Sequence, residues 1–128
     1  MDINIDSLSD FVKVITENNN KHFYHDIAHL QIVYRGHANI NWNLIPSAFR
    51  SDDDFLNERI YLRECLREIP EEFDALNFFD TLVKVQHYGV PTRLLDFTLN
   101  PLVALYFSCI GENDEDGCVI AIGPIRKH

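Results

Sequence analysis

The amino-acid sequence predicts a small α/β domain of the α+β type, in which about four helices pack on one small mixed sheet of a few short strands. Three observations support this class. The chain has 128 residues, which suits a single domain with one core. Of these residues, 46% are hydrophobic and 12% are aromatic, as in globular proteins. Long segments with helical spacing are interspersed with short β-favouring runs.

Capping and breaking residues define most ends of the predicted helices. We expect the asparagines at 18–20 to end the first helix, and Gly89 to cap the third. Pro101 suits the first position of the fourth helix, whose apolar composition predicts burial on nearly all sides. On the second helix, glutamates such as Glu58 are interspersed with arginines four residues apart, which predicts a solvated, ion-paired face. The first predicted helix has Asp6 or Ser7 as its N-cap candidate and ends at the asparagines, and the other three are residues 52–69, 73–87 and 101–109.

Two β-favouring runs predict strands. QIVY, residues 31–34, ends at Arg35-Gly36, and CVIAIG, residues 118–123, has the composition of a strand buried on both faces. Residues 92–96 could form a brief strand or extended strut. The asparagine-rich stretch before the second helix predicts a loop, whose anchors to the core would be its large apolar residues: Trp42, Leu44, Ile45 and Phe49.

The charge of the chain limits its function. The formal net charge is -9, with 20 acidic and 11 basic residues. Phosphate backbones and anionic membranes need clustered lysine and arginine, so a broad nucleic-acid or membrane surface is disfavoured. A local basic pocket for one small anion remains compatible with this charge.

The cysteines and the N-terminus predict a cytoplasmic protein. The three cysteines lack the paired spacing of a zinc ribbon, and Cys65 and Cys109 lie in apolar patterns that predict reduced core residues. The acidic N-terminus lacks the apolar core of a signal peptide, and we expect no membrane-spanning helix. His25 and His29 are four residues apart, but no second motif accompanies them, so we expect no metal site.

Residues 86–107 contain the densest group of candidate functional side chains. Polar residues there lie between two apolar helices, where buried polar groups need partners. Arg93 and Asp96 either brace the loop as an ion pair, or Arg93 grips a phosphate or carboxylate that Asp96 orients. His87, at the end of a predicted helix, is either a cap or a proton donor. The further candidate ligand contacts in this stretch are Tyr88, Thr92 and Thr98.

Arg35 is the second half of the candidate site. It follows a predicted strand directly, and Gly36 after it would let a ligand or backbone approach closely. Arg35 therefore either contacts a ligand or forms a structural ion pair. We expect the guanidinium groups of Arg35 and Arg93 to open into one cleft with His87, and we assign catalytic roles to Arg35, His87 and Asp96.

Two sequence blocks resemble the FRG domain family, which is named for a Phe-Arg-Gly triplet. The first block is YRGHANINWNLIPSAFR, in which the triplet is Tyr34-Arg35-Gly36, followed by the helix with Glu58. The second is VQHYGVPTRLLDFTLNPLVALYFSC. The resemblance covers about residues 30–122 of a single domain spanning 1–128. It implies a compact α/β domain of bacteria and phages, often found near defence or toxin functions.

Three functions compete. The first is a binding module for a nucleotide or another small anion, built on Arg35, His87, Arg93 and Asp96. The second is an enzyme using NAD, because the order of parts is similar to ADP-ribosyltransferases, with Arg35 holding the dinucleotide and Thr92 or Thr98 lining the pocket. The late glutamate of those enzymes has no clear counterpart here. The third is an acidic protein-interaction domain, an inhibitor or sensor, without catalysis.

Overall fold

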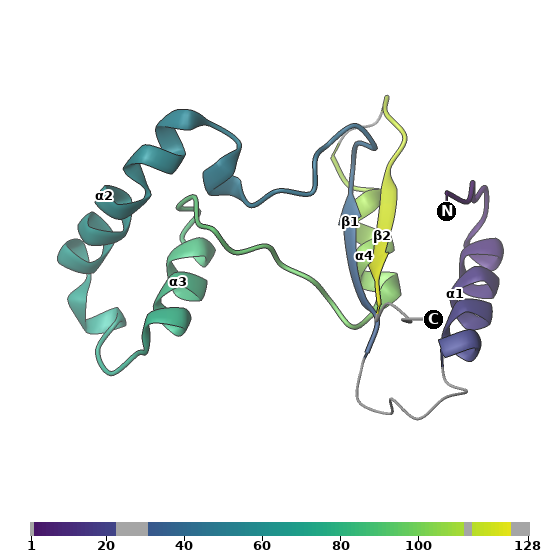
Figure 1. The fold of residues 1–128 in the computed structure, drawn as a ribbon, viewed down its shortest axis with the longest axis horizontal. Helices are drawn as coiled ribbons and strands as arrows, with labels where there is room; N and C mark the ends of the chain where they lie inside the picture. The colour runs from purple at the N-terminus through teal and green to yellow at the C-terminus, as the bar shows by residue number, and fades with distance from the viewer. Residues whose placement is uncertain (1, 23–30, 112–113, 124–128) are drawn as a thin grey trace, which may run out of the picture. The chain divides into compact units, whose positions relative to one another are not determined.

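A computed structural model describes residues 2–22, 31–111 and 114–123 of the chain. The α+β class is confirmed, with helices and one antiparallel pair of strands in the described ranges (Figure 1). Contacts divide the chain into a sheet unit, Met1–Trp42 with Phe97–His128, and a helical unit, Asn43–Asp96. The elements are α1 (Leu8–His22), β1 (Val33–His37), a 3₁₀ helix at Ser47–Phe49, α2 (Asp52–Glu68), a 3₁₀ helix at Pro70–Glu72, α3 (Phe78–His87), α4 (Pro101–Ser108) and β2 (Cys118–Ile122).

In the sheet unit, α4 packs on the antiparallel pair of β1 and β2, with Val33 opposite Ile122 and His37 opposite Cys118. The approach is close at Gly36, where an added Cβ would lie 1.9 Å from the carbonyl oxygen of Ala104. Only glycine leaves room for the helix backbone there. Of the two alternatives for residues 92–96, a brief strand or an extended strut, the strand does not form. Thr98, which lies outside the named strands, forms a single bridge with Tyr34 of β1.

Burial in the sheet unit differs from the prediction. Helix α4 was expected to be buried nearly all round, but its buried residues are the small Ala104 and Ser108. Four of the large apolar side chains of α4 are exposed: Leu102, Val103, Tyr106 and Phe107. Strand β2 is half-buried at most and exposed at Ile122, and Cys109 is exposed rather than in the core. A two-stranded sheet offers too little surface to cover these groups.

Helix α1 is longer than predicted. Ser7 caps it, because its hydroxyl oxygen accepts a hydrogen bond of 3.1 Å from the backbone N–H of Asp10. The asparagines at 18–20 were expected to end the helix, but it continues to His22. Asparagine has only a modest helix penalty, which neighbouring turns readily outweigh.

In the helical unit, α2 begins at the predicted residue 52, but α3 begins at Phe78 and not at the predicted residue 73, because a 3₁₀ helix and a turn precede it. Ser51 caps α2 ahead of three aspartates, and Asn77 caps α3 through a hydrogen bond of 2.9 Å from the N–H of Asp80. Gly89 follows α3 with φ +83°, the left-handed conformation that ends many helices. The unit's buried apolar side chains are Ala48, Phe73, Leu82 and Val85.

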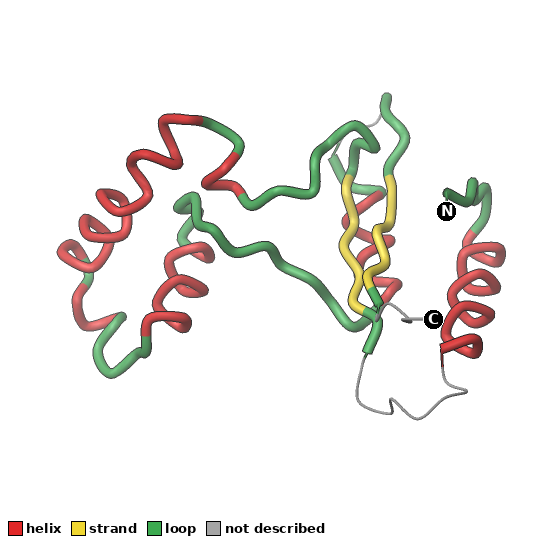
Figure 2. Tube along the Cα trace, viewed as in Figure 1, coloured by secondary structure: helices red, strands yellow, loops and turns green. Residues whose placement is uncertain are grey.

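The predicted loop anchors are mostly wrong. Trp42 is 48% exposed and Phe49 is 47% exposed, and Leu44 is exposed as well. The fully buried residue of this stretch is Ala48. After α3, residues 88–100 form one long loop up to Pro101, drawn in green in Figure 2. No helix in the described ranges is both long and apolar enough to cross a lipid bilayer.

Candidate functional site

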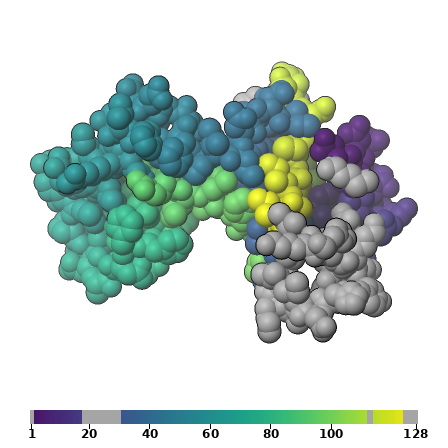
Figure 3. Space-filling model, viewed as in Figure 1, coloured from purple at the N-terminus to yellow at the C-terminus, as the bar shows by residue number. Residues whose placement is uncertain are grey.

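Thr92 is the centre of a buried hydrogen-bond network in the helical unit. It is 1% exposed, and its hydroxyl donates to Oε1 of Gln86 and accepts from the backbone N–H of Leu94 at 3.2 Å. Its own N–H donates to Oγ of Ser47 at 3.1 Å, and its carbonyl accepts from the N–H of Ala48 at 3.1 Å. The network therefore joins the loop after α3 to the 3₁₀ helix before α2. In the space-filling view, green atoms of the loop are bordered by the teal atoms of this unit (Figure 3).

Gln86 extends the network to Asp96. Its amide Nε2 donates to Oδ2 of Asp96 at 2.6 Å, while its Oε1 accepts from Thr92. Asp96 itself is exposed, so the amide orients a carboxylate that solvent can reach. Gln86 was not singled out from the sequence, although it opens the motif QHYGVPTRLLD.

Arg93 pairs with Glu58, so its predicted pairing with Asp96 is wrong. The Arg93 Nε donates to both carboxylate oxygens of Glu58, at 3.0 and 3.2 Å, and a terminal nitrogen makes a further bond to Oε2. The backbone N–H of Arg93 also donates to Oε1, at 3.2 Å. Helix α2 positions the two carboxylate oxygens of Glu58 beside Arg93. Oδ2 of Asp96 instead accepts a hydrogen bond from Gln86.

Glu58 is buried, which corrects its assignment to a solvated helix face. Its side chain is 10% exposed, whereas the Arg93 side chain is 57% exposed. The hydrogen bonds from the Arg93 side chain hold the pKa of the Glu58 carboxyl below its ordinary value, against the opposing effect of burial. The same pair raises the pKa of Arg93. The buried Glu58 carboxylate thus holds the Arg93 side chain in place, although more than half of that side chain is exposed to solvent.

His87 and Tyr88 lie at the C-terminal end of α3, and both are exposed. The Tyr88 ring packs beside Phe73 at 6.4 Å between centroids. Nearby, the Lys84 ammonium lies 2.5 Å from the Glu72 carboxylate and holds the pKa of Glu72 below its ordinary value. The His87 side chain is accessible to solvent, and its role stays a prediction.

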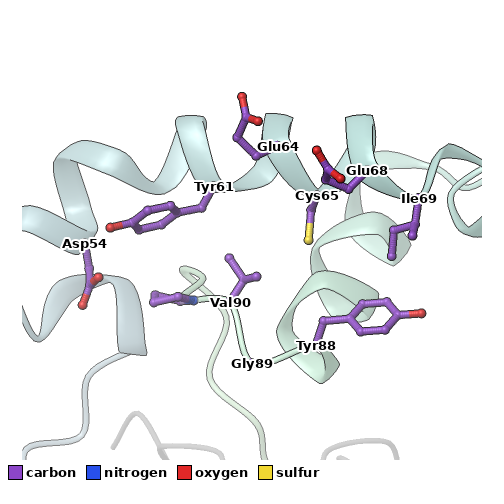
Figure 4. A pocket seen from close by; sticks show the side chains of 10 residues that line it. Asp54, Tyr61, Glu64, Cys65, Glu68, Ile69, Tyr88, Gly89 and Val90 are labelled. Carbon is purple, nitrogen blue, oxygen red and sulfur yellow. The ribbon is translucent and has the colours of Figure 1, made fainter.

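An open groove of about 580 Å³ runs between α2 and the start of the loop after α3 (Figure 4). Cys65 and Ile69 point from α2 toward the loop, Val90 points back toward α2, and the Tyr61 side chain extends toward Asp54. Carboxylates are present at its rim, and none of the lining residues is basic. The sequence did not predict this groove, because its two sides are far apart in the chain.

Arg35 belongs to the sheet unit. It is half-buried on β1, and its Nε donates a hydrogen bond of 3.1 Å to Nε2 of His37, which is 3% exposed. The backbone of Thr98 pairs with Tyr34, at 2.7 and 2.8 Å, and the Thr98 hydroxyl oxygen accepts from the N–H of Asn100 at 3.1 Å. Thr98 therefore helps to hold the entry to α4.

The predicted site residues are divided between the two units. The sheet unit contains Arg35, Gly36 and Thr98, and the helical unit contains His87, Tyr88, Thr92, Arg93 and Asp96. The prediction that Arg35 and Arg93 open into one cleft with His87 stays a prediction, as do the roles of these residues. Among the described residues, no group of three or more His, Cys, Asp or Glu side chains could hold a metal ion, and His25 and His29 lie outside the described residues.

The lowered pKa values of Glu58 and Glu72 predict a loss of stability in acid. A carboxylate with a lower pKa in the folded state binds fewer protons than in the unfolded state, so it contributes stability above its unfolded pKa of about 4.3. That contribution is lost as the pH falls through the folded pKa. Urea unfolding between about pH 3 and 7 should show this decline, and Glu58→Gln should flatten it. An unchanged pH profile in Glu58→Gln would contradict the prediction.

Comparisons with known proteins support one family. The FRG domain matches residues 30–117, a span that includes both Arg35 on β1 and the motif from Gln86 to Asp96. Searches among curated proteins and among solved structures found no match. The matched span contains the Glu58–Arg93 pair and the Thr92 network as well. Because the match covers more than half of the chain, the protein belongs to the FRG domain family.

Proposed function

We propose that this FRG domain binds a small anionic ligand, such as a nucleotide, through Arg35. The observation that carries the proposal is the hydrogen bond from Arg35 Nε to His37 on the same strand. Because a guanidinium is planar, a bond at Nε also orients the plane of its two terminal nitrogens. A guanidinium oriented in this way is suited to gripping a phosphate or carboxylate through two parallel bonds.

The charge of the protein favours a small ligand over a polymer. Arg35 is a half-buried cation in a chain of net charge -9. A local positive site in a negative protein attracts a compact anion, whereas an extended nucleic acid would meet repulsion from the surrounding surface. Nucleotides, phosphorylated metabolites and carboxylates therefore fit the site, and a long polyanion does not.

The other predicted site residues enter the proposal with different roles. His87 and Asp96 are exposed and remain candidates for proton transfer. Arg93 is held by Glu58, and the Thr92 hydroxyl is occupied within the loop network. We therefore infer framework roles for Arg93 and Thr92, and Arg35 is the first residue to test.

NAD is the ligand that would make the protein an enzyme. If the remote likeness to ADP-ribosyltransferases holds, Arg35 grips the dinucleotide, and transfer of ADP-ribose to a nucleophile releases nicotinamide. The resemblance to the FRG domain family further suggests that the protein acts in a defence or toxin function of bacteria or phages. Release of nicotinamide separates this enzyme from a module that only binds.

Thermal unfolding with added nucleotides tests the proposal. NAD, ADP, ATP or ADP-ribose at one hundred times its dissociation constant should stabilise the protein by about 2.7 kcal/mol. Arg35→Lys, which keeps the charge but loses the planar fork, should abolish most of that shift. Arg59→Lys, the same change at an exposed position of α2, is the matched control and should leave the shift intact.

Two results would overturn the proposal. One is the absence of any shift with nucleotides, phosphate or carboxylates. The other is an equal shift in the wild type and in Arg35→Lys, provided that the ligand-free melting point shows Arg35→Lys to be folded. Chromatography of the NAD samples measures nicotinamide directly and decides between enzyme and binding module.

A further inference from the structure

The groove of the helical unit combines an apolar interior with an acidic rim. Its interior is formed by aromatic and aliphatic side chains, among them Tyr61, Ile69 and Val90. The acidic residues lining it are Asp54, Glu64 and Glu68, all from α2. Such a groove offers apolar burial to a ligand and attracts positive charge at its edges.

The ionic contacts of the rim leave it negative. Arg67 bridges Glu64 at 2.6 Å and Glu68 at 3.4 Å, and its side chain is 70% exposed. Exposed pairs of this kind contribute little free energy, so a cation from a partner can replace Arg67. Asp54 forms no ion pair with any described residue. The groove is therefore lined by three carboxylates, and Arg67 pairs with two of them, Glu64 and Glu68.

The groove is long enough for a peptide segment. Its lining extends along α2 from Asp54 to Ile69, and a helix rises about 1.5 Å per residue, which makes the groove about 22 Å long. An extended chain covers that length with about seven residues at roughly 3.3 Å each. A single small cation would leave most of this apolar surface uncovered.

We propose that this groove binds a short segment of a partner protein in which lysine or arginine residues flank bulky apolar residues. The apolar side chains contact Tyr61, Cys65, Ile69 and Val90, and the basic side chains pair with the rim carboxylates. Tyr61 and Tyr88 add aromatic faces to which cations are attracted. The proposal is independent of ligand binding at Arg35.

Fluorescence anisotropy with labelled heptapeptides tests this proposal. The probes are peptides of alternating lysine and leucine, of alternating glutamate and leucine, and of alternating lysine and serine. The lysine–leucine peptide should bind saturably, and the other two should bind at least about tenfold more weakly, because each lacks one of the two required properties. Arg35→Lys should not change its affinity.

Charge reversal at the rim supplies the matched comparison. Glu68→Lys should lower the affinity for the lysine–leucine peptide by about fivefold, which is within the range of an exposed charge pair. The same change should raise the affinity for the glutamate–leucine peptide. Glu71→Lys makes the same change at an exposed residue outside the groove and should alter neither peptide. Circular dichroism confirms that both variants are folded.

Several outcomes would overturn the proposal. These are the absence of saturable binding up to about 1 mM peptide, equal binding of the three peptides, and equal effects of Glu68→Lys and Glu71→Lys. Tetrapropylammonium displacing the peptide at equal concentration would instead indicate a small-cation site. Self-association that Glu68→Lys abolishes would assign the groove to a second copy of the chain.

Discussion

Replacing Gly36 by alanine should unfold the sheet unit. The new Cβ would lie 1.9 Å from the carbonyl oxygen of Ala104 and 2.8 Å from the backbone nitrogen of Ser108. Both atoms belong to the backbone of α4, so no side-chain rotation can relieve the clash. The strand and the helix must separate, at an expected cost of at least about 3 kcal/mol. Urea unfolding and hydrogen exchange of the β1 amides would measure the loss.

Gly111→Ala is the control for this substitution. Gly111 has φ +114°, and an added Cβ there meets no atom within 4 Å. Its replacement therefore introduces backbone strain alone, at about 1 kcal/mol. If Gly36→Ala were no more destabilising than Gly111→Ala, the close packing of α4 on β1 would not be the reason for glycine at position 36.

Breaking the Glu58–Arg93 pair should destabilise the helical unit. Glu58→Gln keeps the shape of the side chain but removes its charge, and we expect it to lower the free energy of unfolding by about 2 kcal/mol. The loss stays this small because water hydrates the largely exposed Arg93 when its partner is neutral. Arg93→Ala leaves the buried Glu58 carboxylate without its cation and should be more destabilising than Glu58→Gln. Urea unfolding of each variant at neutral pH measures these free energies.

A double-mutant cycle separates this pair from ordinary surface charges. Glu58→Gln combined with Arg93→Ala should cost clearly less than the two single changes added together, because neither partner is then left alone. Glu64→Gln removes a partner of the exposed Arg67 and should change stability by less than about 0.5 kcal/mol. Strict additivity at Glu58 and Arg93 would show that they do not act as a pair.

Local signals in the sequence predicted the elements better than their packing. Asn100 caps α4 and Gly89 ends α3, because caps depend on neighbouring residues alone. Burial on α4 was predicted wrongly because hydrophobic patterns favour the largest side chains as core. The contact with Gly36 requires the smallest ones, so Ala104 and Ser108 face the strand.

The candidate site was predictable as a region but not as a set of contacts. The density of polar residues around Arg93 indicated partly buried interactions, and the structure contains them. The partner chosen from the sequence, Asp96, was the nearest carboxylate along the chain. The actual partner, Glu58, is 35 residues away, and its position among charged helix residues concealed its burial. Long-range pairs of this kind have no local signal in one sequence.

The hydrogen bonds between Thr92 and the Ser47–Ala48 backbone have a consequence for the chain as a whole. The helical unit is a continuous segment, whereas the sheet unit is assembled from the segments on either side of it. By bonding Ala48 to Thr92 at 3.1 Å, the network brings the entry and exit of the helical unit together. Segments whose ends meet can be inserted, lengthened or exchanged with little disturbance to the host fold. We therefore expect that the sequence of the helical unit, with its groove, can be replaced while the sequences of β1, β2 and α4 are kept.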